Sequence, residues 1–309
     1  MALGSFAVSC TLCALFSVRA EAQVPDVLRE RPTAYVAAFG GAGAGAIGLL
    51  DARWINPALL AADVPATFEV GLFKSTVTDI TGARLGVSGR LRRFGRFSLD
   101  VRRRQIDDLL DDSTLAATPG LEVSDWGLQL GYARGLMGGR LHIGASWETL
   151  SSRVFGTTGG GWTADVGAAA EITSNVSIGI TLAHLGPRYA WRDALGGDSY
   201  SPQGRTIVGG VRWSFGQARR VGVQVAGDVV RAVEAAAEEG MRIGGEVMLL
   251  RHVALRGGYA RMQDANDSAR GMASAGLGLR IRNVRIDIAR DRLGSVVGER
   301  TLVDFSIHR

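Results

Sequence analysis

The sequence predicts an all-β protein: a single transmembrane antiparallel β-barrel of about 14 strands with an N-terminal plug or hatch segment. Three observations predict it: hydropathy that alternates with a period of two over long runs, connections that alternate between short and long, and charges kept to one face of the runs. Successive side chains of a strand point to opposite faces, so this period gives each strand one apolar and one polar face. Glycine is abundant, at 43 residues, but the 7 prolines and the 46% of hydrophobic residues argue against a Pro/Gly-rich disordered chain.

The first segment, residues 1–22, has the features of a secretory signal peptide. An apolar stretch from Leu3 to Val18 precedes Ala20-Glu21-Ala22, a small-x-small cleavage pattern. A transmembrane anchor is the alternative, but about 16 apolar residues are short for ~30 Å of hydrocarbon. Cleavage before Gln23 would remove both cysteines, which suits an oxidising compartment. We therefore expect export, and with the barrel, a location in the bacterial outer membrane.

Residues 23–66 are the predicted periplasmic or plug segment. Their Gly/Ala-rich part, residues 40–61, contains a G-x-G-x-x-G pattern at 43–48 that also occurs in dinucleotide-binding folds. Such a fold needs an uninterrupted helix and further βαβ units, whereas Asn56-Pro57 stops any helix after about two turns. Glycine and alanine let backbone pack closely inside a narrow barrel. We therefore expect a plug; an unattached periplasmic tail is the alternative.

The remaining residues, 67–309, form the predicted barrel and contain fourteen alternating runs. Most runs have 9–12 residues, close to the ~9–11 that a tilted strand needs to cross a bilayer. Strands of soluble sandwiches are usually shorter, at about 5–6 residues. In order, the runs are 68–75, 82–91, 94–105, 123–134, 140–155, 161–171, 175–185, 205–215, 220–230, 240–249, 252–261, 271–281, 284–290 and 300–308.

The connections sort by parity. Those after even-numbered runs are tight, and they are 92–93, 135–139, 172–174, 216–219, 250–251 and 282–283. Those after odd-numbered runs are mostly longer and more polar, as at 106–122, 186–204, 231–239 and 262–270. Short turns on one rim and long loops on the other are typical of bacterial outer-membrane barrels. An even number of strands then places both ends of the barrel on the periplasmic side.

Charged residues within the runs occupy the polar face, where opposite signs can pair around a lumen. An arginine facing lipid at the bilayer midplane would cost about 2–4 kcal/mol, so this parity is a strong constraint. The predicted lumen-facing charges are Arg84, Asp100, Arg102, Asp165, Arg212, Arg242, Glu246, Arg256, Arg280, Arg285, Asp287 and Asp304. On the apolar face, aromatic residues fall toward both rims, as in a membrane girdle: Trp126, Trp162, Tyr259, Phe97, Tyr132, Trp213 and Phe215.

The sequence offers no catalytic, metal or cofactor set. The four histidines lack metal-ligand spacing, and neither a G-x-S-x-G elbow nor a Ser/His/Asp set stands out. The acidic pairs at 107–108 and 111–112 lack the glycine and glutamate of a calcium loop. The isoelectric point near 9.7 does not indicate nucleic acid, because the arginines follow strand parity instead of clustering. Pairing in the lumen, or contact with outer-membrane lipid and lipopolysaccharide, explains them better.

The two ends of the chain resemble a known group of outer-membrane proteins. Gly40 to Gly48, then Asp51, Trp54 and the stretch Ile55-Asn-Pro-Ala-Leu-Leu-Ala61, resemble the N-terminal signature of the PorV/PorQ family and of the related FadL-type transporters. Residues 283–307 are similar to the closing hairpin of PorV/PorQ proteins. The plug motif carried over is Gly43, Gly45, Gly48, Asp51, Asn56, Pro57 and Ala58. The single acid Asp51 and the terminal Arg309, where an aromatic is usual, depart from the pattern.

The resemblance implies a fourteen-stranded barrel and one of two non-enzymatic functions. FadL-like proteins admit small hydrophobic or amphipathic molecules through a lumen closed by the N-terminal segment, whereas PorV-like proteins bind partners of type IX secretion. The two longest loops, at 106–122 and 186–204, offer little room for a receptor domain. A purely structural barrel is a third possibility, but a lumen wider than that of an eight-stranded barrel is hard to fill with side chains alone. We therefore expect the channel.

Overall fold

The computed structural model describes residues 31–62, 66–76, 80–106, 123–154, 156–193, 195–216, 221–234, 237–263, 269–292 and 298–309. The expected signal peptide, and the acidic pairs at 107–108 and 111–112, lie outside these residues. Within them, no helix is both long and apolar enough to cross a membrane. No group of three or more His, Cys, Asp or Glu side chains there is arranged to hold a metal ion.

The described chain begins with short helical turns and continues as strands. The helical elements before the sheet are α3 (Ala34–Ala38), η1 (Leu50–Trp54) and η2 (Pro57–Ala61); η3 (Arg92–Phe94) and η4 (Met137–Gly139) lie in turns. The strands are β1 (Thr67–Ser75), β2 (Ile80–Arg90), β3 (Arg96–Ile106), β4 (Val123–Leu136), β5 (Leu141–Val154), β6 (Thr157–Glu171), β7 (Val176–Leu185), β8 (Tyr189–Arg192), β9 (Asp198–Ser201), β10 (Thr206–Phe215), β11 (Val221–Ala232), β12 (Glu239–Leu249), β13 (Val253–Gln263), β14 (Ala269–Ile281), β15 (Val284–Arg292) and β16 (Glu299–His308).

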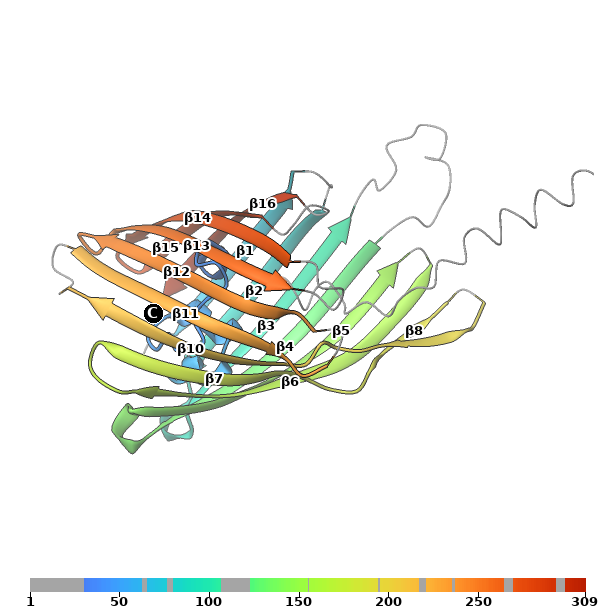
Figure 1. Ribbon diagram of the computed structural model, residues 1–309, viewed down its shortest axis with the longest axis horizontal. Helices are drawn as coiled ribbons and strands as arrows, with labels where there is room; N and C mark the ends of the chain where they lie inside the picture. Colours follow the sequence, from blue (N-terminus) through green and yellow to red (C-terminus); the bar gives the residue numbers. More distant parts are fainter. Residues whose placement is uncertain are drawn as a thin grey trace, which may run out of the picture.

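Fourteen of the described strands form a closed antiparallel barrel, which confirms the predicted fold (Figure 1). Neighbours in sequence pair with one another, β7 pairs with β10, and the pairing of β1 with β16 from Thr67–His308 to Ser75–Arg300 closes the ring. Six connections of two to five residues, between 91–95 and 282–283, gather at one rim, here called the short-turn end. The opposite rim is the long-loop end.

One feature of the long-loop end differs from the sequence prediction. Residues 186–204, expected to be a loop, contain the hairpin β8–β9, whose first strand pairs with β6 at Thr158 to Gly160. Tyr189 fills the space under this hairpin: its ring packs against Leu150, and its hydroxyl donates to Ser152 Oγ at 3.0 Å. Burial raises the pKa of the Tyr189 hydroxyl to about 12. The hairpin thus extends the barrel wall at the long-loop end.

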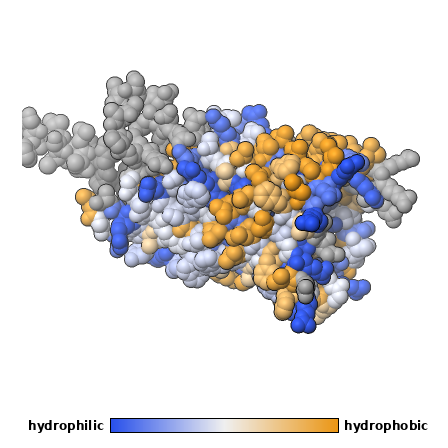
Figure 2. Space-filling view, turned by 180° about the vertical axis from the view of Figure 1, so that it is seen from behind, coloured by the Kyte–Doolittle hydropathy of each residue, from blue (hydrophilic) through white to orange (hydrophobic). Residues whose placement is uncertain are grey.

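The two faces of the wall differ sharply in polarity. Large apolar side chains such as Leu130, Trp126 and Ile180 are exposed on the outside. Figure 2 shows hydrophobic residues gathered over part of the face that it presents. The alternate positions point inward and carry the charges: Asp100, Asp287 and Asp304 are buried. All seven aromatic residues expected in a girdle are exposed as well. The core of this molecule is therefore the polar inside of the barrel together with residues 31–62, while the apolar outer face suits lipid.

Candidate functional site: the barrel lumen and the N-terminal hatch

Residues 31–62, here called the hatch, lie inside the barrel and run from one end toward the other. At the long-loop end the carbonyl of Arg31 accepts a hydrogen bond from Arg300 Nη2 at 3.0 Å. Helix α3 follows, capped by the Thr33 hydroxyl, which accepts from Val36 N, and packs against β13 to β16. Near the short-turn end Arg212 donates to the carbonyl of Ile47. Helix η2 then packs against β4, β5 and β6 before β1 begins at Thr67.

Glycines of the wall let the hatch backbone approach the strands without intervening side chains. A Cβ added at Gly179 would lie 2.0 Å from the carbonyl oxygen of Ala44, and one at Gly258 would lie 2.2 Å from the nitrogen of Gly40. Gly40 itself has φ +68°, a conformation that favours glycine. Since real side chains cannot occupy such positions, the high glycine content serves close backbone packing between hatch and wall.

Inward carboxylates of the wall hold backbone N–H groups of the hatch. Asp228 on β11 accepts from Gly43 N at 2.8 Å and from Ala44 N at 3.1 Å. On the opposite part of the ring, Asp304 on β16 accepts from Ala34 N at 2.6 Å. A hydrogen bond to a charged group contributes about 1.5–3 kcal/mol. These contacts fasten the irregular backbone of the hatch to two distant strands.

Asn56 joins three parts of the structure through one fully buried side chain. Its Oδ1 accepts from Ala58 N at 3.0 Å and so caps η2, where Pro57 occupies the first helical position. Its Nδ2 donates to the carbonyls of Ala44 at 2.7 Å and of Ala168 at 3.0 Å. The Asn-Pro-Ala motif therefore both ends one hatch turn and ties the hatch to β6.

A buried charge cluster surrounds the side chain of Arg53. Its guanidinium donates to both carboxylate oxygens of Glu69, at 3.1 and 3.0 Å, and to Asp100 Oδ1 at 3.0 Å. Arg84 Nη1 lies 2.7 Å from Glu69 and 3.4 Å from Asp100. Each of these side chains is at most 4 % exposed. Together, two arginines and two acids from the hatch, β1, β2 and β3 balance one another out of water, as buried charges require.

A second charge cluster anchors Asp51, the other charged residue of η1. Arg285 on β15 pairs with Asp51, and its Nε lies 2.6 Å from Asp287. Asp287 also receives Arg256 Nη1 at 2.5 Å, and Arg256 Nε binds Glu246 at 2.6 Å. The wall thus holds the η1 turn at two points: Arg285 of β15 binds Asp51, and Glu69 and Asp100 of β1 and β3 bind Arg53.

The remaining predicted lumen charges have varied surroundings. Arg102 pairs with Glu148 on β5 at 2.6 Å, Asp165 accepts from Ser146 and from His184 N, and Arg242 donates to the Gly41 carbonyl at 3.4 Å. Arg280 faces the same side as Arg285 but is exposed at the short-turn end. Of the plug motif, Gly43, Gly45, Asp51, Asn56, Pro57 and Ala58 are buried, whereas Gly48 is exposed.

Three residues important to these contacts were not singled out from the sequence. Arg53 stands beside Trp54 in the stretch that carries the family resemblance, and Glu69 and Asp228 occupy polar positions of two predicted runs. Strand parity, which placed the other charges inward, also places Glu69 and Asp228 inward. Strand parity does not show which of the inward-facing acids contacts the hatch.

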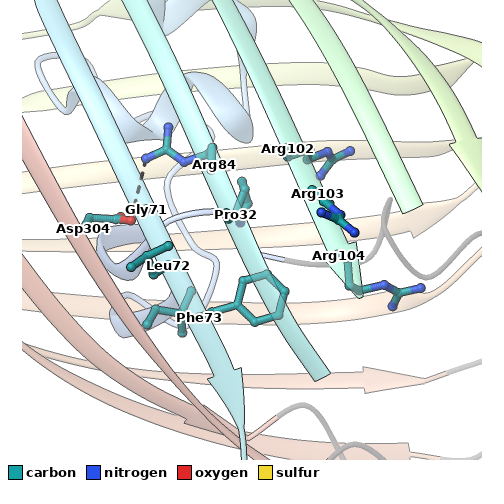
Figure 3. A pocket seen from close by; sticks show the side chains of 11 residues that line it. Pro32, Gly71, Leu72, Phe73, Arg84, Arg102, Arg103, Arg104 and Asp304 are labelled. Carbon is teal, nitrogen blue, oxygen red and sulfur yellow. Dashed lines mark ion pairs between the residues drawn. The ribbon is translucent and has the colours of Figure 1, made fainter. Parts of the chain in front are cut away.

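Little open space remains along the side of the hatch that faces β1 to β3. Figure 3 shows a pocket lined by Pro32 of the hatch, by Gly71 and Phe73 of β1, and by Arg84 of β2. Asp304, which forms an ion pair with Arg84, also lines it. The volume of this pocket is about 20 Å³, room for roughly one water molecule. A larger cavity of about 340 Å³ opens at the short-turn end, between Leu49 and strands β12 to β16. The hatch thus leaves little space at this pocket and a larger cavity at the short-turn end.

Comparison with solved structures finds the same architecture in channels for aromatic hydrocarbons. The monoaromatic hydrocarbon channel CymD is 13% identical, with a TM-score of 0.63 over 90% of this chain and 97% of that one. The Pseudomonas putida toluene transporter TodX is 14% identical (TM-score 0.61, 93% and 98%), and the Ralstonia pickettii toluene transporter TbuX is 13% identical (TM-score 0.54, 89% and 98%).

Comparison by sequence finds neither a matching family model nor a matching curated protein. At identities this low, the solved structures establish the fold and leave the substrate open. The resemblance of the chain ends to PorV/PorQ proteins accordingly stays a prediction. What the chain shares with these solved structures is the fold, here a closed fourteen-stranded antiparallel barrel with residues 31–62 inside it.

Proposed function

We propose that this protein is a non-enzymatic outer-membrane channel for small hydrophobic or amphipathic molecules, with the hatch as its plug. One observation carries the proposal: a hatch fills the polar lumen and is held by ion pairs and hydrogen bonds as well as by clusters of mostly small apolar side chains. The polar contacts can exchange for water as the hatch shifts, and the small side chains present little apolar surface to a path that opens beside them. The architecture shared with toluene and monoaromatic hydrocarbon channels supports the same class of substrate.

The proposal is tested by comparing a free and a locked hatch in the same variant. A Cβ added at Gly276 would lie 2.5 Å from Cβ of Ala38, so cysteines at both positions bring their sulfurs within bonding reach after a small shift. Because the only native cysteines are Cys10 and Cys13, the predicted mature chain adds no competing thiol. Liposomes with the reduced variant should accumulate labelled toluene or xylene faster than those with the oxidised variant.

Equal uptake in both redox states, at rates no higher than in protein-free liposomes, would contradict the channel. In that case, purification of the native protein from membranes distinguishes the alternative suggested by the chain ends, a PorV/PorQ-like component of type IX secretion. That function requires stable protein partners and no dependence on the hatch. Deletion of residues 40–61 complements the test, since removing a plug should raise conductance in planar bilayers, whereas removing a tail should not.

A further inference from the structure

The cavity of about 340 Å³ at the short-turn end combines apolar side chains with several arginines. Its volume lies within the range of small-molecule sites, about 300–1,000 Å³. Tyr35 and Leu49 of the hatch and Met248 of β12 give it apolar surface, and several arginines line the rest. The cavity lies on the opposite side of the hatch from the long-loop end, where a molecule from outside would enter.

The arginines of this cavity fall into two groups. Arg256 and Arg285 are buried and already hold Glu246, Asp287 and Asp51. Arg280 and Arg282 are exposed within the opening, and no carboxylate of the described residues lies within ion-pair distance of either. Glu246 and Asp287 act on Arg280 only at longer range, so neither arginine has an ion-pair partner of its own among the described residues.

Register places Arg280 beside a second cation. In the β14–β15 pair Arg280 stands directly opposite Arg285, so both side chains point into the barrel from adjacent strands. Like charges directly opposite in a sheet destabilise it. Arg282 follows in the two-residue turn, with φ +52°, which holds its backbone at the edge of the same opening. An oxyanion between Arg280 and Arg282 would offset the positive charge at this edge, since arginine binds carboxylates with paired hydrogen bonds.

The apolar wall selects among oxyanions. The Tyr35 ring is fixed by stacking on Phe39 and by the Arg256 guanidinium 4.3 Å from its centroid. Because Tyr35 is only 4 % exposed, the partly exposed side chains of Leu49 and Met248 provide most of the apolar surface for a flat or aliphatic body. We propose that this cavity binds a small amphipathic carboxylate, with its carboxylate at Arg280 and Arg282 and its apolar part against Leu49 and Met248. The inference goes beyond the proposed function, because it concerns a ligand held on the short-turn side of a closed hatch.

Calorimetric titration of the purified, detergent-solubilised protein tests the site with defined probes. Benzoate and cyclohexanecarboxylate should bind saturably, whereas benzyl alcohol, which lacks the charge, and inorganic phosphate, which lacks the apolar body, should bind at least tenfold more weakly. The double variant Arg280→Gln/Arg282→Gln should weaken benzoate binding at least tenfold. Arg140→Gln is the matched control, since Arg140 is exposed in another short turn and does not line the cavity.

Each outcome decides the proposal. Unchanged benzoate affinity in the double variant, an equal loss in Arg140→Gln, or phosphate binding as tight as benzoate would overturn it. Heat-modifiable gel mobility shows that each variant is folded, and Leu49→Ser gives a second measurement in which benzoate should weaken while phosphate does not change. The site and the channel fail separately: toluene uptake that does not depend on the hatch leaves benzoate binding intact, and the double variant can lose benzoate while keeping toluene uptake.

Discussion

The carboxylate of Asp228 accepts the backbone N–H of Gly43 at 2.8 Å, although 185 residues separate the two in sequence. Asp228 also accepts the next N–H, that of Ala44, so one acid on β11 satisfies two successive donors of an irregular backbone. Gly43 has φ +144°, which few other residues adopt. This pair shows in a single contact how the hatch is held: glycine adopts the backbone conformation that is needed, and the wall supplies the hydrogen-bond acceptor.

Replacing Asp228 should loosen the hatch. Asp228→Leu removes the acceptor and leaves two N–H groups unpaired, at a cost of about 1–3 kcal/mol each, while Asp228→Asn keeps one acceptor oxygen and should have a smaller effect. Hydrogen exchange at Gly43 and Ala44 should accelerate in the order wild type, Asn, Leu, and ion conductance should rise in the same order. Asp198→Asn, in the exposed β8–β9 hairpin, serves as the control. Unchanged exchange in the leucine variant would show that Asp228 is not an anchor.

Removing Arg53 should cost far more stability than removing a surface arginine. Arg53→Met leaves Glu69 and Asp100 with Arg84 as their main partner, and breaking a buried ion pair costs about 3–5 kcal/mol. Arg192→Met disrupts the pair with Asp198, whose side chains are 71% and 50% exposed, and exposed pairs contribute about 0.2–1 kcal/mol. Guanidinium unfolding in detergent measures both. Similar losses for the two variants would mean that the Arg53 cluster is not a structural anchor.

Two adjacent glycines of β13 should respond differently to alanine. A Cβ at Gly258 would lie 2.2 Å from the hatch backbone, whereas one at Gly257 would point outward with its nearest neighbour at 3.9 Å. Gly258→Ala should therefore displace the hatch and destabilise the protein by about 1–3 kcal/mol, with Gly257→Ala near wild type. The thermal midpoint of the heat-modifiable gel shift reports the difference. If both variants melt together, the hatch does not pack against β13 as described.

Neighbouring residues of β4 should reveal which face meets lipid. Leu130 points outward and is 48% exposed, while Gln129 is buried and lies opposite Asp100 and Glu148 in the register. Leu130→Arg should lower the free energy of unfolding in lipid vesicles by up to about 2–4 kcal/mol. Gln129→Arg should be tolerated better, because two acids flank it. The reverse order would mean that the apolar face does not contact the membrane.

Most of the barrel follows from the sequence because its cause is local. An alternating run such as Trp126 to Tyr132 determines a strand and its lipid face without reference to any other part of the chain. The prediction is less exact where glycine removes the signal: β6 begins at Thr157, four residues before the predicted run, because Gly159 to Gly161 show no alternation. The β8–β9 hairpin was missed for a related reason, since strands of four residues give too short a pattern.

The contacts of the hatch were less predictable, because they arise between residues far apart in sequence. Composition and the Asn56-Pro57 motif indicated a segment of close-packed backbone with an interrupted helix. They did not indicate that Arg53 meets Glu69, or that Gly43 meets Asp228. Both partners are inward acids among several, and only the register of the closed ring determines which one faces the hatch.

The position of the hatch also constrains the order in which the protein assembles. Its backbone is bound to β16 through Asp304, to β11 through Asp228 and to β7 through Ser177, whose hydroxyl donates to the Gly45 carbonyl at 2.6 Å. If the ring closed first, the hatch would have to enter a narrow passage and form each of these polar contacts there. Because β1 follows the hatch directly, a sheet that curls around the hatch and zips β1 to β16 last avoids that barrier. In that order of assembly the hatch acts as the template around which the barrel wall closes.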